Sequence, residues 1–174
     1  MPGLKDIPDE VRWQLAAENA ARLPALYDRA FRSLVGNRYD GIEQEIWMEL
    51  SRTAYGIVSD LSLPRRNAYE LAETMRTIMT FLFGPGYRSE ALPFPGDGAV
   101  ILVKHCPLLE HGSGLGCSVG CSFHRCLALT LSTIPLLNRK YRARFVRTLC
   151  TGDRQCELKV EIDPEPDVKK EPER

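Results

Sequence analysis

Cysteine is absent from the first 104 residues and from everything after residue 156, so all six cysteines lie between Cys106 and Cys156. Long apolar runs are also missing, and no stretch approaches the roughly 20 residues that a membrane-spanning helix needs. The first ten residues are polar and include Asp6, Asp9 and Glu10, which is unlike a secretory signal peptide. We therefore expect a cytoplasmic protein that does not contact a membrane.

An excess of charge is missing too, because 23 Lys and Arg residues balance 23 Asp and Glu residues. A neutral chain lacks the positive field that draws proteins to nucleic acid, so we expect no direct nucleic-acid binding. Neither a P-loop nor an H-E-x-x-H zinc motif occurs. The 174 residues, 44% of them hydrophobic, are enough for one domain with a buried core and a helical extension.

Helices are predicted for the part of the chain that lacks cysteine. Apolar residues recur at helical spacing from residue 9 to 34, from 40 to 61, and from after Pro64 to Phe83. Pro24 is expected to divide the first of these helices, because proline fits the first turn of a helix and not its interior. The apolar faces of the second and third helices, which carry Trp47, Ile57, Met75 and Phe83, are expected to pack as core or as a dimer seam.

Strands are predicted after Gly84-Pro85-Gly86. Residues 88–94 and 99–104 flank a turn, and residues 141–149 precede a strictly alternating strand at 156–162. A helix at 124–137 lies between the two hairpins. The fold class is therefore α+β, with N-terminal helices followed by a β-β-α-β-β unit and an antiparallel sheet. The expected parts are a helical extension (1–38), a metal- or ligand-binding domain (39–163) and a disordered tail of proline and charge (164–174).

The clustered cysteines indicate metal binding or redox chemistry, since disulfides are rare in a reducing cytosol. Cys150 and Cys156 are expected at facing strand ends, where they supply half of a tetrahedral site. Further sulfurs come from Cys106 at a strand end and from the group Cys117, Cys121 and Cys126. On a regular helix Cys121 and Cys126 point about 140° apart.

Cys126 lies in an apolar run and is most simply a core residue. The candidate metal ligands are then Cys106, Cys117, Cys121, Cys150 and Cys156, and the expected cofactor is an iron–sulfur cluster ([4Fe-4S]) or zinc. Redox-active thiols and inert thiols remain alternatives for the whole set.

Two short motifs carry a resemblance to a known family: Cys106-Pro107 after a strand, and Gly152-Asp153-x-x-Cys156 before the last strand. With a helix that opens Cys121-x-x-His124, this arrangement resembles the 4-vinyl reductase domain over about residues 40–162. Its relatives are the methanogen output domain and the L-2-amino-thiazoline-4-carboxylic acid hydrolase family. The resemblance implies a sensor fold around an apolar pocket that binds a small molecule.

In the phenol sensors of this family, cysteines of the last helix and hairpin hold zinc together with a glutamate. The matching positions here are Cys121 or Cys126, Cys150 and Cys156, but Arg147 stands where the glutamate is found. The cysteine pattern is also similar to the C-terminal domain of iron–sulfur-sensing repressors. That likeness implies a [4Fe-4S] cluster on Cys106, Cys121 and Cys156.

We therefore expect a cysteine-ligated metal-binding domain that acts as a small-molecule or redox sensor, or as an accessory domain. It would bind a small molecule in its apolar pocket and form a homodimer or bind a protein partner. The alternative is a small hydrolase of the L-2-amino-thiazoline-4-carboxylic acid hydrolase type, with the Cys121 thiolate as nucleophile and His124 or His105 as base. The module is preferred because no acid–base pair accompanies the thiols at motif spacing.

Overall fold

The computed structural model describes residues 3–114 and 121–164, and the side chains of residues 113, 114 and 121 are not described. Helices come first and a four-stranded antiparallel sheet follows, which confirms the α+β class. The elements in order are η1 (Leu4–Asp6), α1 (Asp9–Val35), α2 (Arg38–Asp60), α3 (Ala68–Phe83), β1 (Arg88–Phe94), β2 (Gly98–His105), α4 (Pro107–Gly114), α5 (Cys121–Leu137), β3 (Tyr141–Arg147), η2 (Leu149–Thr151) and β4 (Cys156–Ile162).

The sheet has the order β1-β2-β4-β3, so the last strand, β4, lies between β2 and β3. Ile101 of β2 pairs with Leu158 of β4, and both are buried on the face that meets the helices. The strand residues between these buried positions face the opposite side of the sheet. There Glu161 of β4 binds Arg144 of β3 (3.0 Å). The basic strand β3 is therefore a solvated partner of the acidic positions of β4, as the alternation of the sequence predicts.

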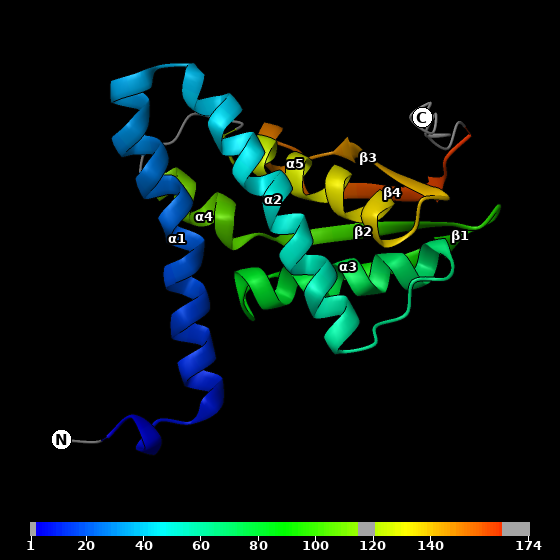
Figure 1. Ribbon diagram of the computed structural model, residues 1–174, viewed down its shortest axis with the longest axis horizontal. Helices are drawn as coiled ribbons and strands as arrows, with labels where there is room; N and C mark the ends of the chain where they lie inside the picture. Colours follow the sequence, from blue (N-terminus) through cyan, green and yellow to red (C-terminus); the bar gives the residue numbers. More distant parts are fainter. Residues whose placement is uncertain (1–2, 115–120, 165–174) are drawn as a thin grey trace, which may run out of the picture.

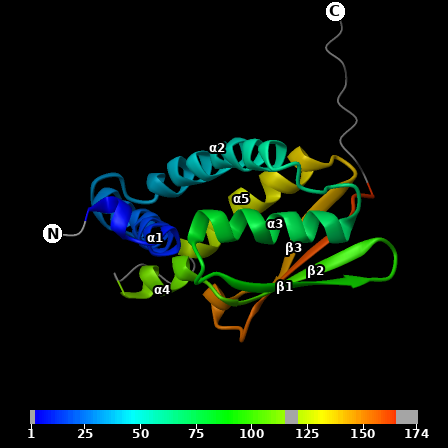
Figure 2. The same cartoon turned by 90° about the horizontal axis from the view of Figure 1, so that it is seen from below.

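The helices cover one face of the sheet (Figures 1 and 2). Helices α3 and α5 pack directly on the strands, α2 lies over these two helices, and α1 and α4 lie at one end. The expected core residues Trp47, Met75 and Phe83 are buried, whereas Ile57 is half-buried. In the part of the chain that the structure describes, none of the helices has the length and apolar character needed to cross a membrane.

Two local expectations are wrong, and one helix that the sequence pattern does not predict is present. Helix α1 runs unbroken through Pro24, whose carbonyl accepts a hydrogen bond from Arg125 (3.1 Å), so contacts with α5 outweigh the missing backbone donor. Residues 107–114 form helix α4 although glycine and serine are frequent there. Cys150 lies in the 3-10 turn η2 and not at the end of β3, because the chain turns inward after Arg147.

Gly84 allows α1 to pack closely on the end of α3. It has φ of +84°, and a Cβ built on it would lie 2.7 Å from Cβ of Ala17 in α1. Only glycine combines this backbone conformation with such a short approach. The end of α3 and α1 are thereby held against each other.

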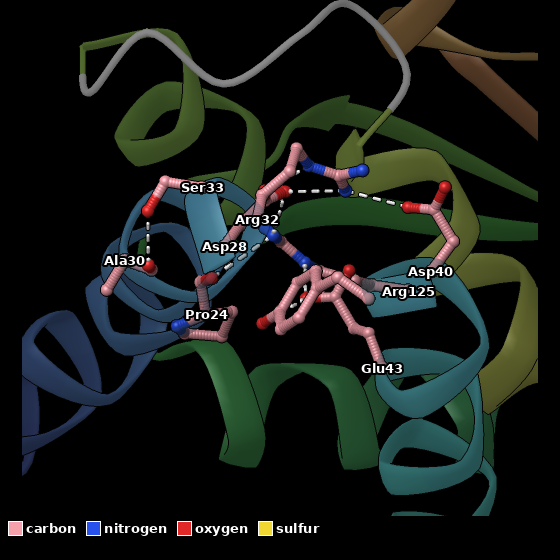
Figure 3. Close-up of polar contacts among 9 residues, drawn as sticks. Pro24, Asp28, Ala30, Arg32, Ser33, Asp40, Glu43 and Arg125 are labelled. Atoms are coloured by element: carbon pink, nitrogen blue, oxygen red, sulfur yellow. Dashed lines mark hydrogen bonds and ion pairs between the residues drawn. The ribbon is translucent and has the colours of Figure 1, made fainter. Parts of the chain in front are cut away.

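A buried charge cluster joins α5 to α1 and α2 (Figure 3). The Arg125 side chain is 1% exposed; its Nε donates to Glu43 Oε1 (2.6 Å) and its Nη2 donates to Asp28 Oδ2 (3.2 Å). Arg32 bridges Asp28 (2.6 Å) and Asp40 (2.7 Å) at the solvent side of the cluster. Each charge has an opposite partner, which is what burial of charged groups requires.

Candidate functional site

Three of the six cysteines converge on one small cavity between the sheet and α5. Cys106 follows β2, Cys126 lies on the second turn of α5, and Cys156 is the first residue of β4. The space among them is about 20 Å³, enough for one water molecule or one ion. Apolar and aromatic side chains complete its wall: Met75, Met79, Tyr87, Ile101, Val103, Phe145 and Leu158.

The surroundings of these thiols favour the protonated form. Burial raises the pKa of Cys126 well above its ordinary value, and the neighbouring Cys106 and Cys156 raise it further. Burial also raises the pKa of Cys106, although the backbone amides of Leu109 and Leu108 oppose the shift. At neutral pH the three sulfurs are therefore thiols and not thiolates.

Cys156 is held by its own local contact. The Leu149 backbone N–H donates to its Sγ at 3.3 Å, which fixes the sulfur at the start of β4. Burial nevertheless raises the pKa of this thiol. Tyr87, which lines the same cavity, also has its pKa raised well above the ordinary value, mainly by burial and then by the neighbouring cysteines. The site is thus a dry, uncharged pocket of sulfur and aromatic groups.

The structure brings together only part of the predicted ligand set. Cys106 and Cys156 meet at the cavity, whereas Cys150 is buried in η2 and does not line it. Cys117 lies outside the described residues, and so does the side chain of Cys121. Among the residues that the structure describes, no group of three His, Cys, Asp or Glu side chains is placed to hold a metal ion.

Cys126 is the residue that the sequence reasoning left out. Its position in an apolar run suggests a core side chain, and it does pack against the core. The signal that identifies it is the geometry of α5: the helix turns the Cys126 side toward the sheet, where the ends of β2 and β4 meet. Strand pairing supplies the other part of that signal, because Val103 of β2 pairs with Cys156 of β4.

His105 and His124, the two histidines expected as possible bases, lie away from the thiol cavity. His105 Nδ1 is 2.6 Å from the Gly86 carbonyl, and its Nε2 is 3.3 Å from Glu110. His124 is exposed on α5, on the side of the helix near Asp40. Neither lines the thiol cavity.

A second and larger hollow lies among the helices. This groove has a volume of about 440 Å³ and is bounded by α1, α2, α3 and α4. It is mostly apolar, and its lining residues are Ala20, Leu23, Pro24, Tyr27, Tyr39, Glu43, Ile46, Trp47, Glu49, Leu50, Thr53, Leu82, Phe83 and Leu108. Its size is that of a site for a small molecule. The resemblance implies an apolar pocket between the sheet and the helices, whereas this groove lies among helices alone.

The two hollows are linked by aromatic rings. Trp47 and Phe83 of the groove have ring centroids 6.0 Å apart, and Phe83 and Tyr87 are also 6.0 Å apart. Tyr87 lines the thiol cavity. A continuous row of packed side chains thus runs from the groove to the three cysteines.

Comparison with known proteins finds solved structures of similar α+β fold. No family model matches the chain, and no curated protein matches it. The chain is similar to the crystal structure of trafficking protein particle complex subunit 3 from Naegleria fowleri covalently bound to palmitic acid. The TM-score is 0.50 at 13% identity, over 89% of this chain and 97% of that one. At this identity the likeness establishes a shared fold alone.

Proposed function

We propose that this protein is a binding module that senses a thiophilic metal ion or a redox change through its three-thiol cavity. The observation that carries the proposal is the convergence of Cys106, Cys126 and Cys156, from three separate elements, on one dry pocket. Cys121 and Cys150, both predicted ligands, are candidates for a fourth sulfur: Cys121 opens α5, and Cys150 is near enough to raise the pKa of Cys126.

The size of the cavity favours a single ion such as zinc over a [4Fe-4S] cluster. About 20 Å³ holds one small atom with its bonds to sulfur, whereas eight iron and sulfur atoms need several times that space. In the described structure the three sulfur atoms are not arranged to bind one metal ion. Metal binding must therefore move the end of β2 and helix α5 closer together. It must also displace the thiol protons, so we expect proton release on binding and tighter binding as pH rises.

The order of elements supports the resemblance to the 4-vinyl reductase domain. The Cys-Pro pair follows β2, and the Gly-Asp-x-x-Cys segment enters β4, as in that family. The chain departs from the family at Arg147, whose Nη1 binds Glu157 (3.2 Å) on the solvent side of the sheet. The glutamate ligand of the phenol sensors therefore has no counterpart here, and we propose that sulfur takes its place.

The alternative hydrolase has less support. A nucleophilic cysteine needs a lowered pKa or an adjacent base, and burial raises the pKa of all three described thiols of the cavity. The sequence does contain Gly116-Cys117-Ser118-Val119-Gly120, which has Gly-x-Ser-x-Gly spacing. A nucleophile elbow of this type follows a strand, whereas the element before this segment is helix α4.

We do not extend covalent acylation from the neighbouring structure to this chain. The cavity lined by Cys106, Cys126 and Cys156 is too small for a fatty acyl chain, and among the described residues no cysteine lines the larger groove. The expected homodimer or protein partner stays a prediction.

Titration of the reduced, metal-free protein with zinc tests the proposal. We expect a rise in melting temperature at one equivalent, with release of protons. Cys126→Ala should abolish both effects. The matched control is Leu158→Ala, which opens the same cavity and lowers stability but leaves the three thiols in place. A zinc response that survives in Cys126→Ala would contradict the assignment, and a single fast-alkylating thiol in metal-free protein would favour the hydrolase.

A further inference from the structure

The groove among the helices has a distinctive charge pattern. Its walls are apolar, and the two charged side chains that line it, Glu43 and Glu49, are both acidic. Lys, Arg and His are absent from the lining of this groove in the described part of the chain. Both carboxylates bind an arginine that lies outside the lining: Glu43 binds Arg125 (2.6 Å) and Glu49 binds Arg52 (3.0 Å). A cationic ligand in the groove would share these carboxylates with the two arginines.

Aromatic rings in the groove favour a cationic ligand. Tyr27, Tyr39, Trp47 and Phe83 all line the groove, and Trp47 is 6% exposed at its base. The faces of aromatic rings attract ammonium and guanidinium groups, most strongly where water is excluded. Four rings beside two carboxylates are the chemistry that recognises an organic cation.

Glu43 provides a specific anchor at the inner end. Its side chain is 6% exposed, and two hydrogen bonds from described residues, from Arg125 Nε (2.6 Å) and the Tyr39 hydroxyl (3.3 Å), end on Oε1. Neither bond uses the second carboxylate oxygen, Oε2. That oxygen is available to a donor in the groove that Glu43 lines.

The cluster behind Glu43 contains one more acidic than basic side chain (Figure 3). Asp28, Asp40 and Glu43 supply three carboxylates, whereas Arg32 and Arg125 supply two guanidinium groups. Burial raises the pKa of Glu43, and the nearby Asp28 adds to the rise, whereas Arg125 opposes it. A ligand cation against Glu43 would complete the charge balance of these five residues.

We propose that the groove binds an organic cation with an apolar body, with its ammonium or guanidinium head at Glu43 and its alkyl or aryl body along the aromatic wall. This site is separate from the thiol cavity and does not depend on metal binding there. A fatty acid is disfavoured, because its carboxylate would face Glu43 or Glu49.

Three matched probes test the charge preference: 4-phenylbutylamine, 4-phenylbutanol and 4-phenylbutyrate, measured by calorimetry and by tryptophan fluorescence. Trp13→Phe leaves Trp47 as the reporter, because the chain has two tryptophans. We expect the amine to bind roughly tenfold or more tighter than the alcohol, and the carboxylate to bind weakest. Equal affinities, or tightest binding of the carboxylate, would overturn the proposal.

Variants locate the site. Glu43→Gln should reduce the affinity for the amine to that of the alcohol. Glu45→Gln makes the same charge change on the same helix outside the groove and should leave the affinity unchanged. Glu43→Gln also removes a partner of Arg125, so a second variant is needed. Ala20→Phe places a large side chain in the groove from an exposed position of α1 and should abolish binding of both amine and alcohol.

Light scattering measures whether the protein is a monomer or a dimer in solution. If a second copy of the chain covers the groove, the protein is a dimer and Trp47 does not respond to the amine at any concentration; that result overturns the proposal. Equal loss of amine binding in Glu45→Gln and Glu43→Gln would overturn it as well, since the effect would then be general electrostatics. Failure of these experiments leaves the zinc response of the thiol cavity untouched.

Discussion

Replacing Arg125 by methionine removes the cation that joins α5 to α1 and α2, while methionine fills much of the same volume. Glu43 and Asp28 would then remain buried without their shared partner. Removing one member of a buried ion pair costs about 3–5 kcal/mol. We expect a loss of this size in the free energy of unfolding, measured by urea denaturation at pH 7.

The pH dependence of this loss identifies its cause. Burial already raises the folded-state pKa of Glu43 above its ordinary value, and Arg125 restrains it through its charge and its hydrogen bond. Without Arg125 that pKa rises further. A carboxyl whose pKa is raised on folding contributes stability below its unfolded pKa and loses that contribution as pH rises through the folded pKa. The cost of Arg125→Met is therefore largest at neutral pH and shrinks toward about pH 5.

A combined variant separates lost charge from lost packing. Asp28→Asn with Glu43→Gln and Arg125→Met removes Arg125 together with the two carboxylates that pair with it in the structure, and neutral replacements of buried ion pairs are often tolerated. We expect it to recover most of the stability that Arg125→Met loses at pH 7. A cost below about 1 kcal/mol for Arg125→Met, or a cost that does not change between pH 5 and 7, would refute the reasoning.

Three further predictions concern the fold and the thiols. Gly84→Ala should lower the free energy of unfolding by about 1–3 kcal/mol, because its methyl group meets α1; Gly41→Ala, in α2 with open space around it, should be neutral or stabilising in the same denaturation assay. Tyr141→Phe removes the hydrogen bond to Asp97 and should cost about 1–2 kcal/mol by thermal or urea unfolding. Cys126 should resist iodoacetamide at pH 7 in the folded protein and react in urea, as mass spectrometry can record, since its raised pKa depends on burial.

Local patterns in the sequence predict most of the elements. The 3.6-residue period gives α2 and α3, and the strict alternation of 156–162 gives β4 with its buried and exposed faces. Pro24 misleads because local propensity does not include the hydrogen bond that its carbonyl receives from α5. Helix α4 is missed because its glycine and serine content is that of a loop.

The sites depend on contacts between residues far apart in the chain, which periodicity does not report. Arg125 is the single Lys or Arg residue of α5, and a lone cation in an otherwise apolar helix is a signal that it pairs with buried acids. Which acids it meets follows only from the packing of α1 and α2 on α5. In the same way, Cys126 joins Cys106 and Cys156 because the sheet and α5 bring the three together, and no spacing rule for metal sites contains that arrangement.

The metal content of the protein after anaerobic purification without chelators tests the central claim most directly. The account predicts one zinc per chain, absent from Cys126→Ala and retained in Leu158→Ala, by mass spectrometry of the metals. A protein without metal in all three forms, or a Cys126→Ala variant with the full zinc content, would contradict it. Four irons per chain with a brown colour would contradict the single-ion site and support the cluster.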